Sequence, residues 1–513
     1  MKHLVLLSGI FTLGLAKTVH FDFWKAKVVP KSSLSRRDND DFSDPLHGDY
    51  HKVQYYTNVT IGTPGQPIAL QLDTGSSDAW VPSIDAEACA DDGCSDFGAF
   101  DKNASSTYRL IKDKAGTFLI VYGDLSYSTG DYFTDVLSFN KNITLKNTTM
   151  ALANATALTE GIMGIGLRSN EASLLYDKPF SFPTVPEQLR NQGHIDRVAY
   201  SLYLDSYDDN TGSILFGGID PSKYTGELLA LPLSKDDEGN YTELSVALTQ
   251  ISIHDGNSTR PLAGTKFNTP ALLDSGTTDS YLPQDIFDAL SAGLGATKDK
   301  TTGFAYVPCA YRKSNVSVIY TFGGKDGVNV SVPLSELIAE QIEDDSAYEN
   351  GTPACSLNFD GTDDANGVIL GDSFLRSAYV VYDLENKVIA LGQAKLGGKA
   401  AANHTAITDI PKGTKLPGVS RTATVTAEQH TTMSLGDPSY SLSLGSIGTP
   451  TFSLPGVSLT ASASATATAA RAVKAASKDS GADLVDIPKS TSAMIVLAFV
   501  MLITKIMEAE IEI

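Results

Sequence analysis

Two short stretches of the sequence place an aspartate in a tight turn directly after an apolar run. The first, LQLDTGSSDAW, contains Asp73 directly after Leu70-Gln71-Leu72, in which apolar and polar residues alternate. A single Asp-Thr-Gly tripeptide is an ordinary turn sequence, because Asp and Thr side chains bond to the main chain and Gly accepts a positive φ. The second stretch, ALLDSGTTDSYL, contains Asp274, 201 residues further along, and two hydroxyl residues again follow the glycine. Two copies with matching flanks indicate a duplicated functional motif.

Paired carboxyl groups suit general acid and general base catalysis, in which one group donates a proton while the other accepts one. Two carboxylates held at one site cannot both ionise cheaply, so a pair of this kind shares one proton. The eight histidines are scattered without His-Glu-x-x-His spacing, and there is neither a Gly-Lys-Ser/Thr phosphate loop nor a Gly-x-Ser-x-Gly turn. The sequence therefore predicts no metal and no cofactor.

Short β-type runs must position these two turns. From about Tyr50 to Gly397 such runs alternate with turns rich in Gly, Asn, Asp and Pro, as in VQYYTNVTIG, FLIVYG and VAYSLYL. This spacing predicts an all-β pair of domains with few helices. The helix candidates are VPEQLRNQG, with a proline near its start and a glycine past its end, and LPQDIFDALSAGL.

These motifs, with several others, resemble those of the pepsin-type aspartic endopeptidases. The resemblance runs in family order from about Tyr55 to Gly397. It is carried by YYTNVTIGTPGQP, DTGSSDAWVPS, ASSTY, VYGDLSYSTGDY, GIMGIGL, GSILFGGIDPSKYTG, LLDSGTTDSYLP and GVILGDSFLRSAYVVYDLENKVIALG. It implies a bilobal, all-β, pepsin-like fold with two β-barrel-like lobes and the active-site cleft between them. We place the N-terminal lobe at residues 38–212 and the C-terminal lobe at 213–397.

The resemblance assigns roles to the hydroxyl residues beside the aspartates. Thr74 and Ser275 match residues that reach across to the opposite loop. Ser76 and Thr277 match residues that hydrogen-bond the outer carboxylate oxygens. The catalytic pair is thereby expected to be locked in place from both lobes.

The same resemblance implies the reaction. Gly75 and Gly276 allow the two backbones to approach closely. A water molecule activated by Asp73 and Asp274 attacks the peptide carbonyl, and no covalent intermediate is needed. Expected partners are peptide and protein substrates and pepstatin-type inhibitors, with the enzyme acting as a monomer.

The flap over the cleft matches Tyr122, Gly123 and Asp124. The family has a second glycine at this tip, where this sequence has Leu125, so the flap departs from the family pattern. Within the family the architecture is most similar to fungal yapsin-type cell-surface proteases, which implies cleavage after basic residues. Asp124 and Asp279 are the candidates for contacting a basic side chain; solvated surface acids are the alternative interpretation.

The composition is acidic, with 60 Asp and Glu against 39 Lys and Arg, a net charge of −21 and a pI near 4.7. Such a charge argues against nucleic acid and favours basic or neutral partners. An apolar run from Leu4 to Leu15 predicts a signal peptide over residues 1–16. The following residues 17–37 end in Arg36-Arg37 and are predicted to be a propeptide; a disordered leader is the alternative.

Secretion allows the four cysteines to pair, and we expect the local bridges Cys89–Cys94 and Cys309–Cys355. Asn-x-Ser/Thr sequons predict a glycoprotein. The candidate asparagines are Asn58, Asn103, Asn142, Asn147, Asn154, Asn240, Asn257, Asn315, Asn329, Asn350 and Asn403. Among them, Asn58 falls in an expected core strand.

The C-terminal part has a different composition. Residues 398–492 are rich in Ser, Thr and Ala, which predicts a disordered, O-glycosylated stalk. Residues 493–513 begin with an eleven-residue apolar run, too short to span a bilayer. With Ser480 as attachment site this tail resembles a glycosylphosphatidylinositol (GPI) signal, although charged residues follow it. We therefore expect a cell-surface protein anchored by lipid, with plain secretion as the alternative.

Two other functions are compatible with the same fold class. One is a catalytically silent pepsin-fold binding protein, and the other is a cell-wall structural or adhesive glycoprotein. Both aspartates and their hydroxyl partners are present, which favours the endopeptidase over either alternative.

Overall fold

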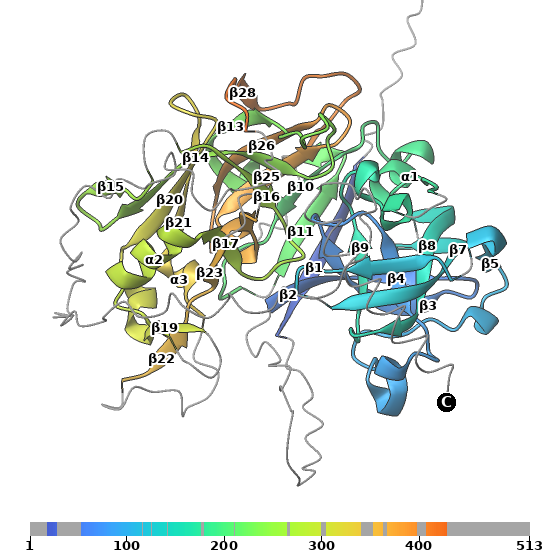
Figure 1. The fold of residues 1–513 in the computed structure, drawn as a ribbon. Coiled ribbons are helices and arrows are strands. Elements are labelled where there is room, and N and C mark those ends of the chain that lie inside the picture. The colour runs from blue at the N-terminus through green and yellow to red at the C-terminus, as the bar shows by residue number, and fades with distance from the viewer. Residues whose placement is uncertain are drawn as a thin grey trace, which may run out of the picture.

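The structure is a computed structural model, and it describes residues 18–27, 53–114, 116–124, 126–140, 142–175, 179–209, 211–263, 267–298, 304–339, 352–362, 367–397 and 407–427. The predicted signal peptide, Arg36-Arg37, Leu125, Asn350, Asn403, Ser480 and the apolar tail lie outside these residues. The described part is mostly β-strand, and its strands form two lobes that face each other in Figure 1. This confirms the predicted all-β, bilobal class.

A 15-stranded sheet forms the first lobe and continues into strands that follow it in the chain, β13, β25, β26 and β28. In its path order, with β6 pairing beside β7, its strands are β28 (Val419–Thr422), β13 (Tyr224–Pro232), β26 (Val388–Ala394), β25 (Ala378–Asp383), β10 (Ala199–Tyr203), β11 (Thr211–Phe216), β1 (Val19–Lys27), β2 (Val53–Ile61), β3 (Gln66–Asp73), β9 (Gly161–Gly164), β4 (Ala79–Pro82), β8 (Thr144–Thr156), β7 (Tyr127–Ser138), β5 (Arg109–Leu110) and β6 (Phe118–Val121). The lobes are therefore joined by continuous strand pairing.

The second lobe is built on an eight-stranded sheet. Its strands are β21 (Val328–Pro333), β20 (Ser317–Phe322), β14 (Ser245–His254), β16 (Thr269–Leu273), β24 (Ile369–Leu370), β17 (Ser280–Pro283), β23 (Phe359–Thr362) and β15 (Thr259–Pro261). Smaller sheets pair β12 (Gly218–Ile219) with β27 (Thr408–Asp409), and β18 (Thr297–Lys298) with β19 (Ala305–Pro308) and β22 (Ala354–Ser356).

Helices are few and short within the described residues. Helix α1 (Val185–Asn191) follows Thr184, whose backbone N–H donates to the Glu187 Oε2 atom at 3.1 Å, and Gly193 follows its end at φ +82°. The other α-helices are α2 (Gln284–Gly293), α3 (Leu334–Leu337) and α4 (Asp372–Leu375). Both helices predicted from the sequence are thus confirmed. No helix in the described ranges is long and apolar enough to cross a membrane.

The two aspartate strands have the same surroundings in the two lobes. Strand β3 pairs in parallel with β9, and β9 pairs antiparallel with β4. In the second lobe β16 pairs in parallel with β24, and β24 pairs antiparallel with β17. Because strand and turn repeat together, each lobe delivers its aspartate from the end of a buried strand.

Part of the predicted propeptide is a strand of the large sheet. β1 lies between β2 and β11, with Val19, Phe21 and Phe23 buried. The Nζ atom of Lys25 donates a hydrogen bond to the carbonyl oxygen of Tyr207. Residues 18–27 are therefore packed into the folded body of this chain.

Residues 407–427 differ from the prediction of an unfolded stalk over residues 398–492. β27 pairs with β12 and β28 pairs in parallel with β13, while Ile410 and Leu416 are buried. The Arg197 Nη2 atom donates to the Lys415 carbonyl oxygen at 3.2 Å. A few apolar side chains and an open sheet edge thus hold a segment whose overall composition is that of a stalk. Residues 428–492 lie outside the described part.

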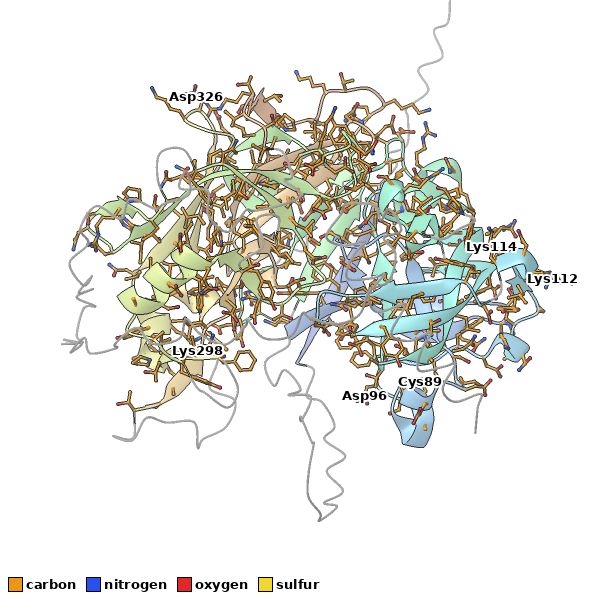
Figure 2. All side chains as sticks on the ribbon, viewed as in Figure 1. Cys89, Asp96, Lys112, Lys114, Lys298 and Asp326 are labelled. Atoms are coloured by element: carbon orange, nitrogen blue, oxygen red, sulfur yellow. A yellow bond between two sulfur atoms is a disulfide. The ribbon has the colours of Figure 1, made fainter. Side chains whose placement is uncertain are left out.

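Both predicted disulfides are present, Cys89–Cys94 and Cys309–Cys355. The first closes a small loop at the periphery of the first lobe, where Figure 2 labels Cys89. Each bridge is local to its own lobe, so neither one ties the lobes together.

Candidate active site

Asp73 is the last residue of β3, and its carboxyl group is held by the turn that follows. The backbone N–H groups of Gly75 and Ser76 donate to its Oδ1 at 2.7 and 3.3 Å. The Ser76 hydroxyl group donates to Oδ2. Each carboxylate oxygen therefore has a fixed donor, and the side chain has one orientation.

Asp274 directly follows β16 and is held in the same way. The Gly276 N–H donates to its Oδ1 at 2.8 Å, and the Thr277 Oγ1 atom donates to its Oδ2 at 2.5 Å. The Asp274 N–H donates to the Leu370 carbonyl oxygen of β24 at 3.1 Å. The duplicated motif in the sequence is thus a duplicated turn in the structure.

The two carboxyl groups meet at the junction of the lobes. Asp73 is 4% exposed and Asp274 is 7% exposed, and their carboxyl groups lie within hydrogen-bonding reach of each other. A Cβ atom on Gly75 would lie 2.6 Å from the Asp274 Cγ atom, and one on Gly276 would lie 2.4 Å from the Asp73 Oδ1 atom. Both positions therefore require glycine.

Two buried hydroxyl groups cross between the loops. The Thr74 Oγ1 atom donates to the Leu273 carbonyl oxygen at 2.8 Å and accepts from the Ser275 N–H at 2.9 Å. The Ser275 Oγ atom donates to the Leu72 carbonyl oxygen at 2.9 Å and accepts from the Thr74 N–H at 3.2 Å. Each loop is thereby bonded to the strand that carries the opposite aspartate.

Burial and the neighbouring charge favour one proton on this pair. Burial, followed by the negative charge of Asp274, raises the pKa of the Asp73 carboxyl group well above its usual range. The hydrogen bonds from Ser76 and Gly75 act in the opposite direction and are smaller effects. At acidic pH the pair therefore holds one proton. One carboxyl group can donate it, and the other is a carboxylate that can accept one.

The predicted flap residues lie between β6 and β7. The indole Nε1 atom of Trp80 donates to the Tyr122 hydroxyl oxygen at 2.7 Å, which fixes the ring. Burial and the charge of Asp73 raise the pKa of Tyr122, so its hydroxyl group stays protonated. The Asp124 carboxylate accepts from the N–H and hydroxyl groups of Ser126 at 3.0 and 2.6 Å. Leu125, where the sequence departs from the family pattern, lies outside the described residues.

The two acids predicted to select substrates have different surroundings. Asp124 is exposed on the flap, and Asp279 is half-buried just beyond the second aspartate loop. A Cβ atom on Gly371 would lie 2.2 Å from the Asp279 carbonyl oxygen, so the backbone of this loop is tightly packed.

Sequence reasoning missed two side chains that support the site. The Asp78 carboxylate accepts from the Tyr132 hydroxyl group at 2.9 Å and from the Ala172 N–H at 2.7 Å, which ties the first loop to β7. Burial raises the pKa of Asp78 to about 6. The Gln71 Nε2 atom donates to the Gly276 carbonyl oxygen at 3.0 Å, across the lobes. Asp78 and Gln71 both lie within LQLDTGSSDAW, but residue type alone gives no sign of these partners.

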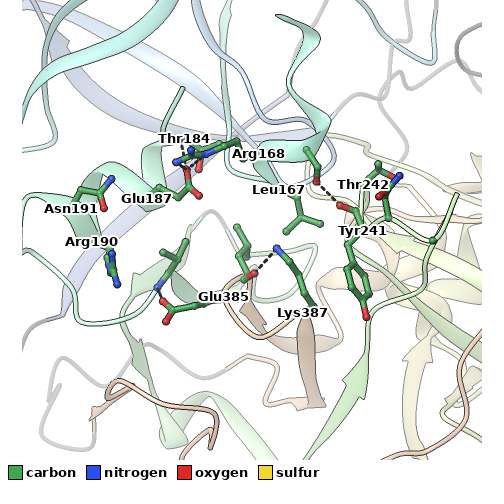
Figure 3. Close-up of a pocket in the computed structure, with 15 residues that line it drawn as sticks. Leu167, Arg168, Thr184, Glu187, Arg190, Asn191, Tyr241, Thr242, Glu385 and Lys387 are labelled. Carbon is green, nitrogen blue, oxygen red and sulfur yellow. Dashed lines mark hydrogen bonds and ion pairs between the residues drawn. The ribbon is translucent and has the colours of Figure 1, made fainter. Parts of the chain in front are cut away.

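A pocket of about 800 Å³ lies between the lobes, and neither aspartate lines it. Figure 3 shows the ion pair between Arg168 and Glu187 on one side and Lys387 and Tyr241 on the other. The Ser169 hydroxyl group donates to the Tyr241 carbonyl oxygen and bridges the two sides. This pocket is separate from the paired carboxyl groups.

Comparison with known proteins identifies relatives over most of the described body. Residues 54–394 match the family model of the eukaryotic aspartyl proteases. The chain is 36% identical to the probable aspartic-type endopeptidase opsB of Aspergillus fumigatus, over 67% of this chain and 69% of that protein. It is 33% identical to the aspartic proteinase yapsin-3 of Saccharomyces cerevisiae, over 82% and 81%. It is 36% identical to candidapepsin-3 of Candida albicans, over 70% and 83%.

One solved structure has the same fold. The crystal structure of an aspartic proteinase from Irpex lacteus superposes with a TM-score of 0.53 at 24% identity, covering 67% of this chain and 96% of that one. This likeness concerns the arrangement of the strands and lobes.

Proposed function

The chain belongs to the eukaryotic aspartyl protease family and is an aspartic-type endopeptidase, and we propose that Asp73 and Asp274 activate one water molecule between them. The observation that carries this proposal is the meeting of two buried carboxyl groups, each on the same turn, within hydrogen-bonding reach. Burying two acids side by side costs free energy, and such pairs are found preferentially at functional sites.

The proton shared by the pair divides the two roles. The ionised carboxylate takes a proton from water, which attacks the carbonyl carbon of the peptide bond. The protonated carboxyl group donates a hydrogen bond to the carbonyl oxygen as negative charge develops there. A proton then passes to the leaving nitrogen, the C–N bond breaks, and both products are released without a covalent intermediate.

The surrounding loops supply geometry to this step. Ser76 and Thr277 hold the outer carboxylate oxygens, which leaves the inner oxygens to face the water. Thr74 and Ser275 keep the loops in register because each hydroxyl group both donates and accepts across the lobes. Positioning of this kind keeps reacting atoms near their productive geometry.

We assign the flap the role of covering the substrate. Tyr122 is anchored to Trp80 and its ring is half-buried close to the Asp73 charge. A ring held at this place would cover the substrate and limit the access of bulk water during the reaction.

Substrate preference is the finer part of the proposal. We infer cleavage after basic residues, with Asp124 and Asp279 contacting the basic side chain. The net charge of −21 would also draw basic peptides toward the enzyme. If Asp124→Asn and Asp279→Asn both leave the preference for Lys or Arg over Leu peptides unchanged, this assignment is wrong.

The cellular setting is proposed from the sequence. A signal peptide at 1–16, a propeptide at 17–37 and lipid attachment at Ser480 would give a secretory or cell-surface glycoprotein. The nine predicted sequon asparagines within the described residues are all exposed, Asn58 included, as glycan addition requires. We expect this enzyme to be a monomer that pepstatin-type inhibitors block.

One assay tests the central assignment. A peptide library is digested at acidic pH by wild type and by Asp73→Asn, with and without pepstatin. We expect cleavage by the wild type that pepstatin blocks and that the variant lacks. Absence of cleavage by the processed wild type would instead favour a silent binding protein or a structural glycoprotein.

A further inference from the structure

The pocket of about 800 Å³ has no role in the proposed reaction. Residues from 167–169 and 184–191 line it on one side, and residues from 239–242 and 384–387, far along the chain, line it on the other (Figure 3). Ligand sites in proteins measure about 300–1,000 Å³. The pocket is therefore large enough for a small oligosaccharide.

One of the predicted glycosylation sites lies in the wall of this pocket. Asn240, Tyr241 and Thr242 form an Asn-x-Thr sequon, and all three residues line the pocket. None of the other eight predicted sequon asparagines within the described ranges lines it. A glycan on Asn240 would therefore begin inside the pocket wall.

A tight turn holds Asn240 in place. Its N–H donates to the Asp236 Oδ1 atom at 2.7 Å, and the Asp236 N–H donates to the Asn240 carbonyl oxygen at 2.9 Å. The Asn240 Nδ2 atom donates to the Glu238 Oε2 atom at 3.4 Å. An amide nitrogen has two hydrogens, so a sugar can replace one while the other keeps this bond. The direction of an attached glycan is thus set by the turn.

The charges in the pocket are largely compensated. The Arg168 Nη2 atom lies 2.5 Å from the Glu187 Oε2 atom, and the Lys387 Nζ atom donates to the Leu384 carbonyl oxygen at 2.8 Å. Two of the three cationic side chains in the lining therefore already have an acceptor. Such a lining favours a neutral ligand that forms hydrogen bonds over an anion.

The remaining lining offers what a neutral sugar chain needs. Arg190 and Asn191, exposed at the end of α1, provide hydrogen-bond donors for hydroxyl and acetamido oxygens. The Glu385 carboxylate provides acceptors, and Tyr241 and Leu167 provide apolar surface. Figure 3 shows Arg190 and Asn191 across the pocket from Tyr241. A chain of sugars that starts at Asn240 can thus reach polar groups on the opposite wall.

We propose that the first sugars of an N-linked glycan on Asn240 occupy this pocket and tie the turn at Asn240 to α1. The protein then carries part of its packing as carbohydrate, since the sugars fill a space that the side chains leave open. This inference rests on the predicted glycosylation of Asn240 and not on the proposed reaction. Its test therefore uses no measurement of peptide cleavage.

The test follows the glycans on the full chain secreted by a yeast host. Glycopeptide mass spectrometry first measures the occupancy of each sequon. The native protein is then treated with an endoglycosidase that cuts between the first two sugars, and the rate of release is measured at every occupied site. The same treatment after denaturation gives the rate without the fold. Arg190→Ala removes a donor from the opposite wall without changing the sequon.

We expect Asn240 to be occupied and its glycan to be released about tenfold or more slowly than the others in the native protein, because a docked glycan must first leave the pocket. After denaturation the rates should be alike. Arg190→Ala should raise the native rate at Asn240 by about threefold or more and leave the other sites unchanged. An unoccupied Asn240, equal native rates, or slow release that Arg190→Ala does not change would each overturn the proposal.

A thermal measurement provides the second readout. Asn240→Gln should lower Tm by about 2 °C or more, because the pocket loses its contents. Asn257→Gln is the matched control, since Asn257 is also an exposed sequon residue whose N–H donates to an aspartate, Asp255, at 3.0 Å. It does not line the pocket, and its Tm should stay within about 1 °C of wild type. Equal shifts in the two variants would contradict a docked glycan.

Discussion

The two aspartate loops hold their carboxyl groups in the same way, but different residues lie behind them. In both, a glycine N–H holds the inner part of the carboxylate and a hydroxyl group holds its outer oxygen. Behind the first loop lies Asp78, whose carboxylate has two hydrogen-bond donors. Behind the second lies Asp372, whose oxygens have no partner among the residues described.

This difference separates the geometry of the turns from the surroundings of the loops. The turn geometry fixes how the carboxyl groups meet, and it is the same in both lobes because strand pairing and turn repeat together. The acids behind the two loops differ instead in what surrounds them. Hydrogen bonds from Tyr132 and Ala172 favour the ionised form of Asp78, whereas Asp372 receives no such hydrogen bond among the described residues and only the charges of Arg376 and Lys25 favour its ionised form. We therefore expect the two catalytic carboxyl groups to be equivalent in the reaction, although the acids behind them have different partners.

The largest expected effect tests whether the two catalytic carboxyl groups are equivalent. Asp73→Asn and Asp274→Asn should each lower kcat/KM by about 1,000-fold or more, since each removes one member of a proton-sharing pair. Steady-state assays measure the loss, and circular dichroism at the same pH controls for folding. If one variant keeps more than a tenth of wild-type activity, the two carboxyl groups are not equivalent partners.

The next effect concerns stability and pH in the first lobe. The pKa of Asp78 is raised to about 6 in the fold, so its contribution is complete below about pH 4 and is lost as pH rises through 6. The loss amounts to about 3 kcal/mol in the free energy of unfolding. Asp78→Asn should flatten this part of the profile, measured by urea unfolding at pH 4, 5, 6 and 7. A variant curve that falls as steeply as that of the wild type would show that Asp78 is not the group responsible.

A smaller effect tests the crossed hydroxyl groups. Thr74→Val removes the acceptor of the buried Ser275 N–H, and Ser275→Ala removes the acceptor of the buried Thr74 N–H, so each should lower the free energy of unfolding by about 2 kcal/mol. The two losses should be similar because the bonds mirror each other. Ser106→Ala, which removes an exposed hydroxyl group bonded to the Thr63 carbonyl oxygen at 3.0 Å, serves as the control. A loss confined to one of the two buried sites would break the symmetry.

Much of this site can be predicted from short stretches of the sequence. The repeated Asp-Ser/Thr-Gly turn predicts the pair of loops, the apolar residues before it predict buried strands, and local spacing predicts both disulfides. These features depend on neighbours in the chain. Asn58 shows the limit of such reasoning, because it lies within core strand β2 and yet its own side chain is exposed.

The remainder depends on contacts between distant segments. Gln71 bonds Gly276, and Asp372 packs behind Asp274, through chain reversals that no local pattern encodes. Residues 407–427 have the composition of a stalk, but Ala423 donates its N–H to the Ala230 carbonyl oxygen at a sheet edge left open by the fold. Burial and pairing at such places are decided by the partner surface and not by the segment itself.

The central claim is that two like loops create one carboxyl pair that works with a single shared proton. The most direct test is the pH dependence of kcat/KM for wild-type cleavage of one peptide, from pH 2 to about 8. The pair predicts a bell-shaped profile, because activity needs one carboxyl group ionised and the other protonated. A profile that rises with pH to a plateau, with no alkaline limb, would contradict the account.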